Sequence, residues 1–303
     1  MIKPPIKLLQ ERDFGQKINV TFEFVIQNLK PLFTSLLYIA GPPALVAGVF
    51  TGVYQSNIFS SLDTPSSSGD GVGLAALAGI HGIFTLPYLL SILFILVSSV
   101  VASLTVYSYM LIYEDQDGPL PTITPAQVWE RVQANLLKYV GFTLGVLFTV
   151  LVSVVFFVIP AIYLAVVFSL IYAVSMRENL GLGDSMRRCF YLITDKWWST
   201  FGLLIIVSII QSIIGYVFQI PTLLFALLKG LKILDGDATA IGVITGVIGT
   251  VGQILTSCFL NTAIFFQYCN LVERREGRGI LGDIEAIGTS ETPRTERREE
   301  DEF

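Results

Sequence analysis

The stretch that decides the fold is YVGFTLGVLFTVLVSVVFFVIPAIYLAVVFSLIYAVSM, residues 139–176, which has no ionisable side chain other than tyrosine. A helix that crosses the roughly 30 Å hydrocarbon core of a bilayer needs about 20 apolar residues. This run is nearly twice that long, and Pro160 lies near its middle. A proline inside a helix removes a backbone donor and crowds the preceding turn. The sequence therefore predicts two short spans, 139–158 and 160–176, that turn at Ile159-Pro160-Ala161.

The composition of the chain also indicates a protein that lies largely within a bilayer. Of its 303 residues, 53% are hydrophobic and only 14% are charged, against about 25% charged in a typical soluble domain. The formal net charge of −5 is concentrated in Asp283–Phe303, which has eight acidic residues and three arginines. The rest of the chain is close to neutral, so we expect no nucleic-acid partner. Residues 1–30 lack the apolar core of a cleavable signal peptide, so the first span is expected to direct insertion.

Six apolar segments predict six transmembrane helices. Gly41-Pro42-Pro43 lies in the middle of the first segment and predicts a kink there. The residues that follow, Tyr54–Gly73, are rich in Ser, Gly and Asp and predict a loop. None of the six segments contains Asp, Glu, Lys or Arg, which argues against a proton-coupled pump or an intramembrane acid–base enzyme. The predicted spans are 32–53, 86–112, 139–158, 160–176, 201–227 and 240–266.

A short amphipathic helix is predicted before each pair of spans. In each case apolar residues recur at offsets of 0, 4, 7 and 11, which places them on one helical face. Thr124, Pro125 and Gln127 together form a helix-start signal, and Asp184 is expected to cap the third helix. We expect all three helices to lie in the membrane interface. The apolar positions are Ile18, Phe22, Val25 and Leu29; Pro125, Trp129, Val132 and Leu136; and Met186, Phe190, Ile193 and Trp197.

The predicted fold is an all-α polytopic membrane protein with six transmembrane helices, arranged as three hairpins that each follow an amphipathic interfacial helix. A unit with two spans returns to its starting side, so the three units form a parallel internal repeat, unlike the inverted repeats of many transporters. Residues 1–30 are expected to form a cytoplasmic arm with the first interfacial helix, and residues 31–269 the membrane domain. Residues 270–303 form a charged tail with too few apolar residues to fold alone, so we expect it to be disordered.

This topology places positive charge on one side of the membrane. With the amino terminus inside, 17 of the 19 Lys and Arg residues lie on the cytoplasmic side, which is the bias that short loops of membrane proteins show. Only Lys229 and Lys232 lie outside. We therefore expect a multi-pass protein of a bacterial inner membrane with both termini in the cytoplasm. A cysteine at Ser67 should react with a reagent added from outside, and a cysteine at Ser185 should not.

Few residues have the pattern of a catalytic or metal site. His81 is the only histidine, so a multi-histidine metal site cannot form, and we predict no cofactor, metal or disulfide. In the sixth span, Gly242, Gly246, Gly249 and Gly252 would let a neighbouring backbone approach closely. A polar stripe follows them, and hydrogen bonding between helices is its favoured interpretation, with a cavity lining as the alternative. The stripe comprises Gln211, Ser212, Gln253, Ser257 and Asn261.

Basic and aromatic side chains gather after the fourth span. Tryptophans beside a lysine are typical of an anchor at the membrane interface. Basic residues on the cytoplasmic side attract anionic lipid headgroups by about 1 kcal/mol each. The predicted lipid-headgroup contacts are Arg187, Arg188, Lys196, Trp197 and Trp198.

Residues 139–277 resemble a bacterial membrane domain that is joined to some glycerophosphodiester phosphodiesterases and also occurs in small stand-alone proteins. The likeness lies in the proline-turned hairpin at Phe157–Tyr163, the acidic Glu178–Gly181, the step Trp198–Gly202 and the aromatic-to-basic ending Tyr268–Gly277. The catalytic part of such phosphodiesterases is a soluble barrel of about 250 residues, for which this chain has no room. The resemblance therefore implies an inner-membrane module without that activity.

The expected function is that of a non-enzymatic membrane module that organises membrane lipids or partner membrane proteins. The alternative is a passive transporter or carrier of a lipidic or weakly polar solute, through a cavity lined by Gln253, Ser257 and Asn261. An enzyme comes third. A continuous cavity that reaches the sixth span would favour transport, whereas a filled bundle with exposed surface helices would favour the organising role.

Overall fold

The computed structural model describes residues 6–62, 85–115, 123–156, 158–231, 233, 239–279 and 281, and all regular secondary structure in these residues is helical. The predicted all-α class is confirmed. The predictions at Ser67 and at His81 fall outside the described residues, as do residues 280 and 282–303 of the predicted tail. The disordered tail predicted for residues 270–303 is wrong at its start, because α12 continues to Glu276. The helices are α1 (Phe14–Gln27), α2 (Leu29–Ile39), α3 (Gly41–Leu62), α5 (Leu86–Asp115), α6 (Pro125–Gln133), α7 (Leu136–Phe156), α8 (Val158–Phe168), α9 (Ile171–Glu178), α10 (Leu182–Ile193), α11 (Trp197–Gly230) and α12 (Thr239–Glu276).

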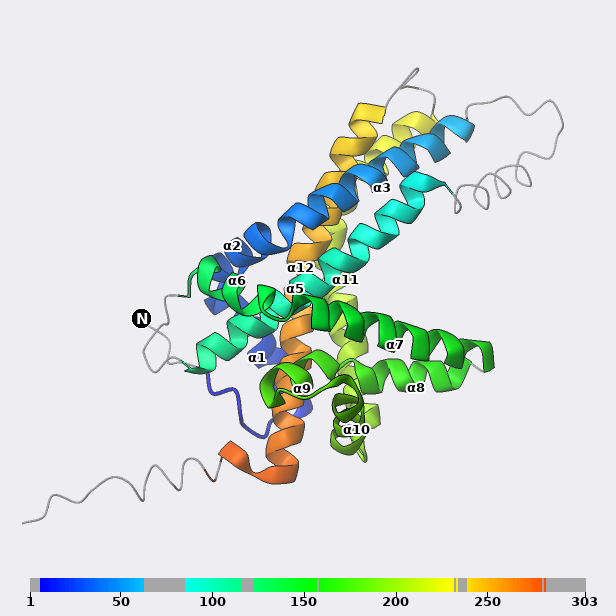
Figure 1. Ribbon diagram of the computed structural model, residues 1–303. Coiled ribbons are helices and arrows are strands. Elements are labelled where there is room, and N and C mark those ends of the chain that lie inside the picture. Colours follow the sequence, from blue (N-terminus) through cyan, green and yellow to red (C-terminus); the bar gives the residue numbers. More distant parts are fainter. Residues whose placement is uncertain are drawn as a thin grey trace, which may run out of the picture.

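Four long helices, α3, α5, α11 and α12, form the body of the molecule (Figure 1). α12 lies at the centre and packs along both α3 and α11. α11 and α12 have 34 and 38 residues, or about 51 and 57 Å at 1.5 Å per residue, which exceeds the hydrocarbon thickness of about 30 Å. Five described helical segments are long and apolar enough to cross a membrane, or six if the bent α2–α3 pair is one span. These helices fit a multi-pass membrane protein.

Glycines let α3 and α12 cross at close range. A Cβ atom added to Gly246 would lie 2.7 Å from the backbone nitrogen of Gly52 and 2.8 Å from the carbonyl oxygen of Gly48. Backbone atoms cannot swing aside as a flexible side chain can, so the crossing requires glycine. The close backbone approach predicted for the sixth span is confirmed at Gly242 and Gly246, with α3 as the neighbouring helix, but not at Gly249 and Gly252, which face side chains.

The first predicted span is broken where the sequence predicts a kink. α2 and α3 meet at a bend of 63°, centred on Ala40. Pro42 and Pro43 lie in the first turn of α3, where a missing N–H costs no intrahelical hydrogen bond. The prolines thus begin a new helix instead of kinking a continuous one. The predicted loop from Tyr54 is wrong at its start, because α3 continues to Leu62.

The carboxyl-terminal halves of α5 and α12 are enclosed by shorter helices. Every residue in 100–111 of α5 and 261–273 of α12 is buried, with α1, α2, α6, α9 and α10 packed around them. Aromatic rings fill this core, among them Phe24 of α1, whose ring meets that of Phe266 edge-on at 5.8 Å. The Tyr109 hydroxyl donates to Asn28 Oδ1 at 3.0 Å. We call the carboxyl-terminal halves of α5 and α12, together with the shorter helices packed around them, the charged end, because most ion pairs of the described residues lie there.

In α1 and α10 the buried face is rotated by about one residue, or about 100°, from the apolar face that the sequence predicts. In α1 the buried face includes Lys17, whose ammonium group meets Gln267 and Ser199, and an apolar pattern cannot reveal such contacts. Leu29 and Phe190, which the sequence assigns to the apolar faces, are 43% and 37% exposed. The buried residues are Lys17, Val20, Thr21, Phe24 and Val25 in α1 and Ser185, Cys189, Leu192 and Ile193 in α10.

The predicted start of α6 is confirmed, and that of α10 is not. The Thr124 hydroxyl and the Gln127 side chain form a capping box around Pro125. α10 begins earlier than predicted, at Leu182, so Asp184 lies in its first turn instead of capping it.

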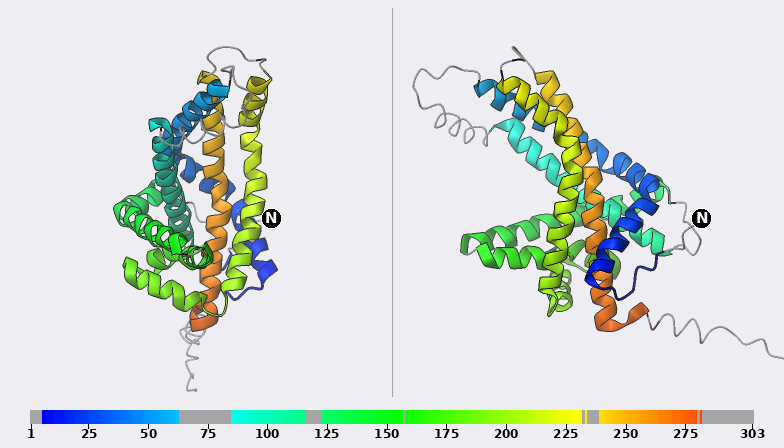
Figure 2. Two further views of the ribbon diagram at one scale, coloured as in Figure 1. Left: turned by 90° about the vertical axis from the view of Figure 1, so that its right-hand side faces the viewer. Right: turned by 180° about the vertical axis from the view of Figure 1, so that it is seen from behind.

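α7 and α8 form a hairpin that does not follow the body of the molecule. The two helices lie side by side, as predicted, and Pro160 falls in the first turn of α8. Their shared direction, however, runs across that of α3, α11 and α12, as Figures 1 and 2 show from three sides. The predicted layout of three equivalent hairpins therefore stays unconfirmed, and it conflicts with this orientation.

Candidate functional site

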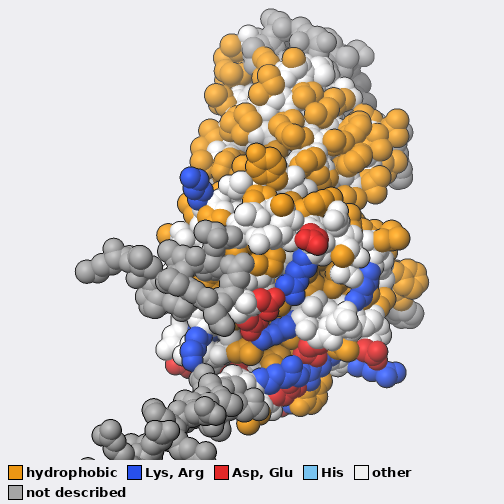
Figure 3. Space-filling view, turned by 60° about the vertical axis from the view of Figure 1, so that its left-hand side comes forward, with side chains coloured by type: hydrophobic (Ala, Val, Ile, Leu, Met, Phe, Trp, Pro, Cys, Tyr) orange, Lys and Arg blue, Asp and Glu red, His pale blue; other side chains and the backbone are white. Residues whose placement is uncertain are grey.

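Charged side chains gather at one end of the molecule. On the face drawn in Figure 3, most Lys, Arg, Asp and Glu side chains lie over one half of the surface, whereas the other half shows mainly hydrophobic and uncharged atoms. The amino-terminal segment reaches the same end as the end of α12, because Asn270 Nδ2 donates to the carbonyl oxygen of Arg12 at 3.1 Å. The described ends of the chain are therefore close together at the charged end.

One group of ion pairs joins α9, α10 and α12. Arg188 Nε lies 2.8 Å from Glu178 Oε2, and Arg188 Nη2 lies 2.5 Å from Glu276 Oε1. The Tyr268 hydroxyl donates to Glu178 Oε1 at 2.9 Å. Burial lowers the pKa of Arg188, but its bonds to the two carboxylates outweigh this and raise the pKa overall. Arg188 therefore stays charged, and its role in the described structure is to hold three helices together.

A second ion pair ties α5 to α9 and α12. Arg177 Nη2 lies 2.6 Å from Glu114 Oε1, and Arg177 Nη1 donates to Cys269 Sγ at 3.3 Å. The side chains of Arg177 and Glu114 are only 15% and 28% exposed. Loss of either partner would leave a largely buried charge without its counterion, which is costly.

Lys17 is a buried lysine at the meeting point of α1, α11 and α12. It is 4% exposed, and its Nζ donates to Gln267 Oε1 at 2.9 Å and to Ser199 Oγ at 3.3 Å. Gln267 Nε2 in turn donates to Thr200 Oγ1 at 2.8 Å. Burial lowers the pKa of Lys17, and the charges of nearby Lys196 and Arg274 lower it further, whereas Asp13 opposes the shift. The sequence contains no signal for this network, because its members are far apart in the chain.

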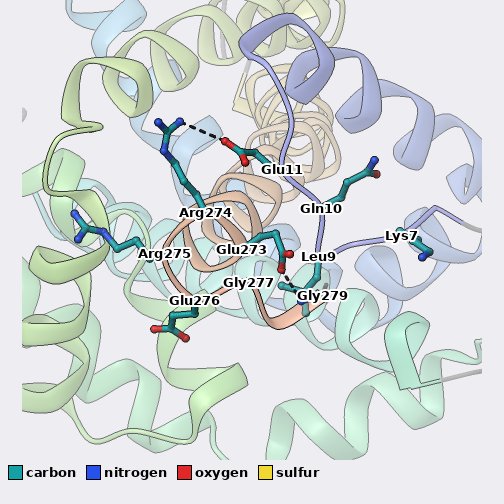
Figure 4. Close-up of a pocket in the computed structure, with 10 residues that line it drawn as sticks. All are labelled: Lys7, Leu9, Gln10, Glu11, Glu273, Arg274, Arg275, Glu276, Gly277 and Gly279. Carbon is teal, nitrogen blue, oxygen red and sulfur yellow. Dashed lines mark hydrogen bonds and ion pairs between the residues drawn. The ribbon is translucent and has the colours of Figure 1, made fainter. Parts of the chain in front are cut away.

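A polar cavity of about 550 Å³ opens between the amino-terminal segment and the end of α12 (Figure 4). Arg274 Nη1 lies 3.5 Å from Glu11 Oε1 across it, and the backbone N–H of Gly279 donates to Glu273 Oε2 at 2.6 Å. Gly277 has φ +61°, the left-handed conformation that ends a helix, and this turn closes one side. The lining mixes both signs of charge: Lys7, Leu9, Gln10, Glu11, Glu273, Arg274, Arg275, Glu276, Gly277 and Gly279.

The five predicted headgroup contacts separate into two groups. Arg188 is committed to Glu178 and Glu276, so it is not free to bind a headgroup. Arg187 is exposed and Lys196 is half-buried, and neither forms an ion pair with a described residue. Trp198 is 77% exposed. Trp197 stacks on Phe201 with ring centroids 5.0 Å apart and on Tyr163 at 5.7 Å, so it fastens α8 to the start of α11.

The predicted polar stripe lies partly between α11 and α12 and partly along α12 itself. The Gln253 side chain packs over Gly215, since a Cβ atom there would lie 2.9 Å from Gln253 Nε2. Ser257 Oγ donates to the Ile254 carbonyl and Asn261 Nδ2 to the Ser257 carbonyl, both within α12. Ser212 is exposed, and Gln211 Oε1 is buried without a hydrogen-bond partner among the described residues.

Two residues that were not predicted from the sequence also lie in the interface between α11 and α12. Gln219 packs on Gly249, and Phe218 packs on Gly252. The spacing Gln211, Gly215, Gln219 repeats every four residues and was the available signal. Large side chains of α11 thus pack over the glycines of α12. The polar cavity beside Arg274 is lined by other residues, and so is the apolar groove at the α2–α3 bend.

An apolar groove of about 560 Å³ lies at the bend between α2 and α3. Pro42 and Pro43 line it together with Val97 and Val101 of α5, and so does Trp129 of α6. Its lining has no charged residue and could accept a hydrocarbon chain: Tyr38, Ile39, Pro42, Pro43, Val97, Val101, Pro125, Ala126, Trp129 and Leu136.

Comparisons of the chain with protein-family models, with curated proteins and with solved structures give no match. The resemblance to the phosphodiesterase-associated membrane domain therefore stays a prediction. Among the residues that the structure describes, no group of three or more His, Cys, Asp or Glu side chains could hold a metal ion.

Proposed function

We propose that this protein is a non-enzymatic integral membrane module that binds anionic lipid at its charged end, with that end in the cytoplasm of a bacterial cell. The observation that carries the proposal is the pair Arg187 and Lys196. These two cations lack an acidic partner among the described residues; Lys196 directly precedes the two tryptophans, and Arg187 is exposed on α10. Arg131, Arg177 and Arg188, by contrast, are all neutralised by carboxylates.

The position of the pair is the one that headgroup binding requires. Trp198 is exposed beside Lys196, and from Ile205 to Leu227 α11 repeatedly exposes large apolar side chains. That stretch is about 34 Å long, close to the hydrocarbon thickness of about 30 Å. We infer that Lys196, which precedes this stretch, lies on the headgroup side of the hydrocarbon. The apolar groove at the α2–α3 bend offers a further place for an acyl chain.

Transport is the weaker candidate. A passive route along the sixth predicted span would need open space beside Gln253, but Gln253 fills the space over Gly215. Ser257 and Asn261 each donate a hydrogen bond to a backbone carbonyl of their own helix. These contacts support a filled bundle, and a filled bundle supports the organising role.

The test is lipid retention by charge-reversed variants of the full-length chain. Phosphatidylglycerol that remains bound to the purified protein would be counted by native mass spectrometry. Arg187→Glu and Lys196→Glu should together weaken binding by at least about 2 kcal/mol, or roughly 30-fold. Lys30→Glu, which reverses an exposed charge at the start of α2, is the matched control and should retain most of the lipid.

Two results would contradict the proposal. Unchanged lipid retention in the Arg187 and Lys196 variant would show that these residues do not bind headgroups. An equal loss in the Lys30 variant would indicate general attraction to positive charge instead of a site. Arg188→Glu is unsuitable for this purpose, because it would also break the ion pairs that join α9, α10 and α12.

A further inference from the structure

The α7–α8 hairpin exposes a large apolar surface, whose contact with water would be unfavourable in free energy. Residues 139–176 carry no charge, and the tip residues Val155, Val158 and Ile159 are 84%, 62% and 80% exposed. Phe148, halfway along α7, is 70% exposed. Full burial of one such side chain is worth about 1.5–3 kcal/mol. Several of them together require an apolar covering.

The hairpin is attached at the edge of the apolar surface and points sideways from it. In the middle of α8 the Tyr163 ring stacks on that of Trp197, the first residue of α11. Just beyond the hairpin, the Tyr172 ring of α9 lies 6.5 Å from that of Tyr107 in α5. From this attachment the two helices run across the direction of α11 and α12 (Figures 1 and 2). If α11 and α12 cross the bilayer, the hairpin cannot cross it as well.

We propose that the α7–α8 hairpin lies along a single leaflet, on the side of the charged end, with the acyl chains of that leaflet as its partner. The hairpin then enters the bilayer without reaching the far face, and the chain crosses four times: at α2–α3, α5, α11 and α12. This inference rests on the membrane setting of the proposed function, but not on headgroup binding by Arg187 and Lys196.

Acyl chains fit the exposed surface better than a protein partner does. Exposed apolar residues occur on both helices of the hairpin, including Leu144 and Leu151 on α7 and Ile162 on α8. A second protein would cover one side, whereas lipid surrounds the whole projection. The surface is also continuous through Tyr163 and Trp197 with the exposed apolar residues of α11, so one leaflet covers both.

The test measures the depth of the tip in vesicles of phosphatidylcholine and phosphatidylglycerol that contain the full-length protein. A fluorophore on Val155→Cys or Ile159→Cys would be quenched by phospholipids brominated either near the glycerol or near the chain end. Ile213→Cys, exposed at the middle of α11, marks the depth of a crossing helix, and Thr194→Cys at the charged end marks water. Both tip positions should lose most of their fluorescence, chiefly to the shallow bromines, whereas Ile213→Cys should respond chiefly to the deep ones.

Sided labelling completes the design. Leu231→Cys, 61% exposed after the end of α11, should react with a membrane-impermeant thiol reagent at the far face, and Val155→Cys should not. Reaction of Val155→Cys at the far face would show that the hairpin crosses and would overturn the inference. Absence of quenching at both tip positions, with Ile213→Cys quenched, would overturn it too, because protein or water would then cover the tip. Absence of quenching at Ile213→Cys as well would refute the membrane setting, and the proposed function with it.

Discussion

Replacement of Gly246 by alanine should separate α3 from α12. The added Cβ atom would lie 2.7 Å from the backbone nitrogen of Gly52 and 2.8 Å from its Cα, distances that folded proteins do not accept. Because the obstacle is backbone, relief requires the two helices to move apart. Overpacking of this kind costs about 1–3 kcal/mol, and the better helix propensity of alanine recovers up to about 1 kcal/mol. We expect a net loss of about 1–2 kcal/mol in the free energy of unfolding.

Gly141 in α7 provides the matched control. A Cβ atom there would meet no atom within 4 Å, so Gly141→Ala has only the helix-propensity gain of about 0.5–1 kcal/mol. Both variants would be unfolded by denaturant in mixed micelles and compared with the parent chain. Gly246→Ala should unfold at lower denaturant and Gly141→Ala at equal or higher denaturant. Equal stability of the two variants would refute the close crossing of α3 and α12.

Three further outcomes follow from the charged end. Arg188→Met should lower the free energy of unfolding by about 3 kcal/mol, because it leaves the Glu178 carboxylate without its cation. A double-mutant cycle with Glu178→Gln should show coupling between the two side chains. Effects that add within about 0.5 kcal/mol would contradict the ion pair. Because burial lowers the pKa of Lys17, the folded protein loses this proton at a lower pH than the unfolded chain. The free energy of unfolding should therefore rise with pH between that lowered pKa and the ordinary value of 10.5; Lys17→Met should flatten this part of the pH profile, and an unchanged profile would rule out the buried ammonium. Burial raises the pKa of the Cys189 thiol to about 12, so a maleimide should leave it unmodified at pH 8 until the protein unfolds, and rapid modification of the folded protein would show that α10 does not pack as described.

The apolar periodicity of the sequence is informative about which segments are helical but not about how these helices face each other. The bend at Gly41-Pro42-Pro43 and the capping box at Thr124 follow from local backbone chemistry, so they could be predicted. The inner face of α1 could not, because Lys17 is buried only where Gln267 and Ser199 supply oxygen atoms for its ammonium group. A lysine beside an apolar stripe is normally assigned to the outer face, and this assignment rotates the whole helix by one residue.

The sequence also does not show which basic residues of the candidate site are paired with carboxylates. Arg187 and Arg188 are indistinguishable as adjacent cations in the sequence, yet only Arg188 lies within reach of the Glu178 and Glu276 carboxylates. The direction of the α7–α8 hairpin is likewise set by contacts between distant residues, those of Tyr163 in α8 with Trp197 and of Tyr172 in α9 with Tyr107. An apolar run with a central proline indicates a hairpin, and its composition is the same whether the hairpin crosses a bilayer or lies along one leaflet.

We infer that the α11–α12 pair crosses a bilayer with the charged end on one side. Its most direct test places single cysteines at Thr194, before α11, and at Leu231, after it, and adds an impermeant thiol reagent to one face of sealed vesicles of known orientation. We expect the reagent to modify Thr194→Cys only from the face of the charged end and Leu231→Cys only from the opposite face. Modification of both cysteines from the same face would contradict it.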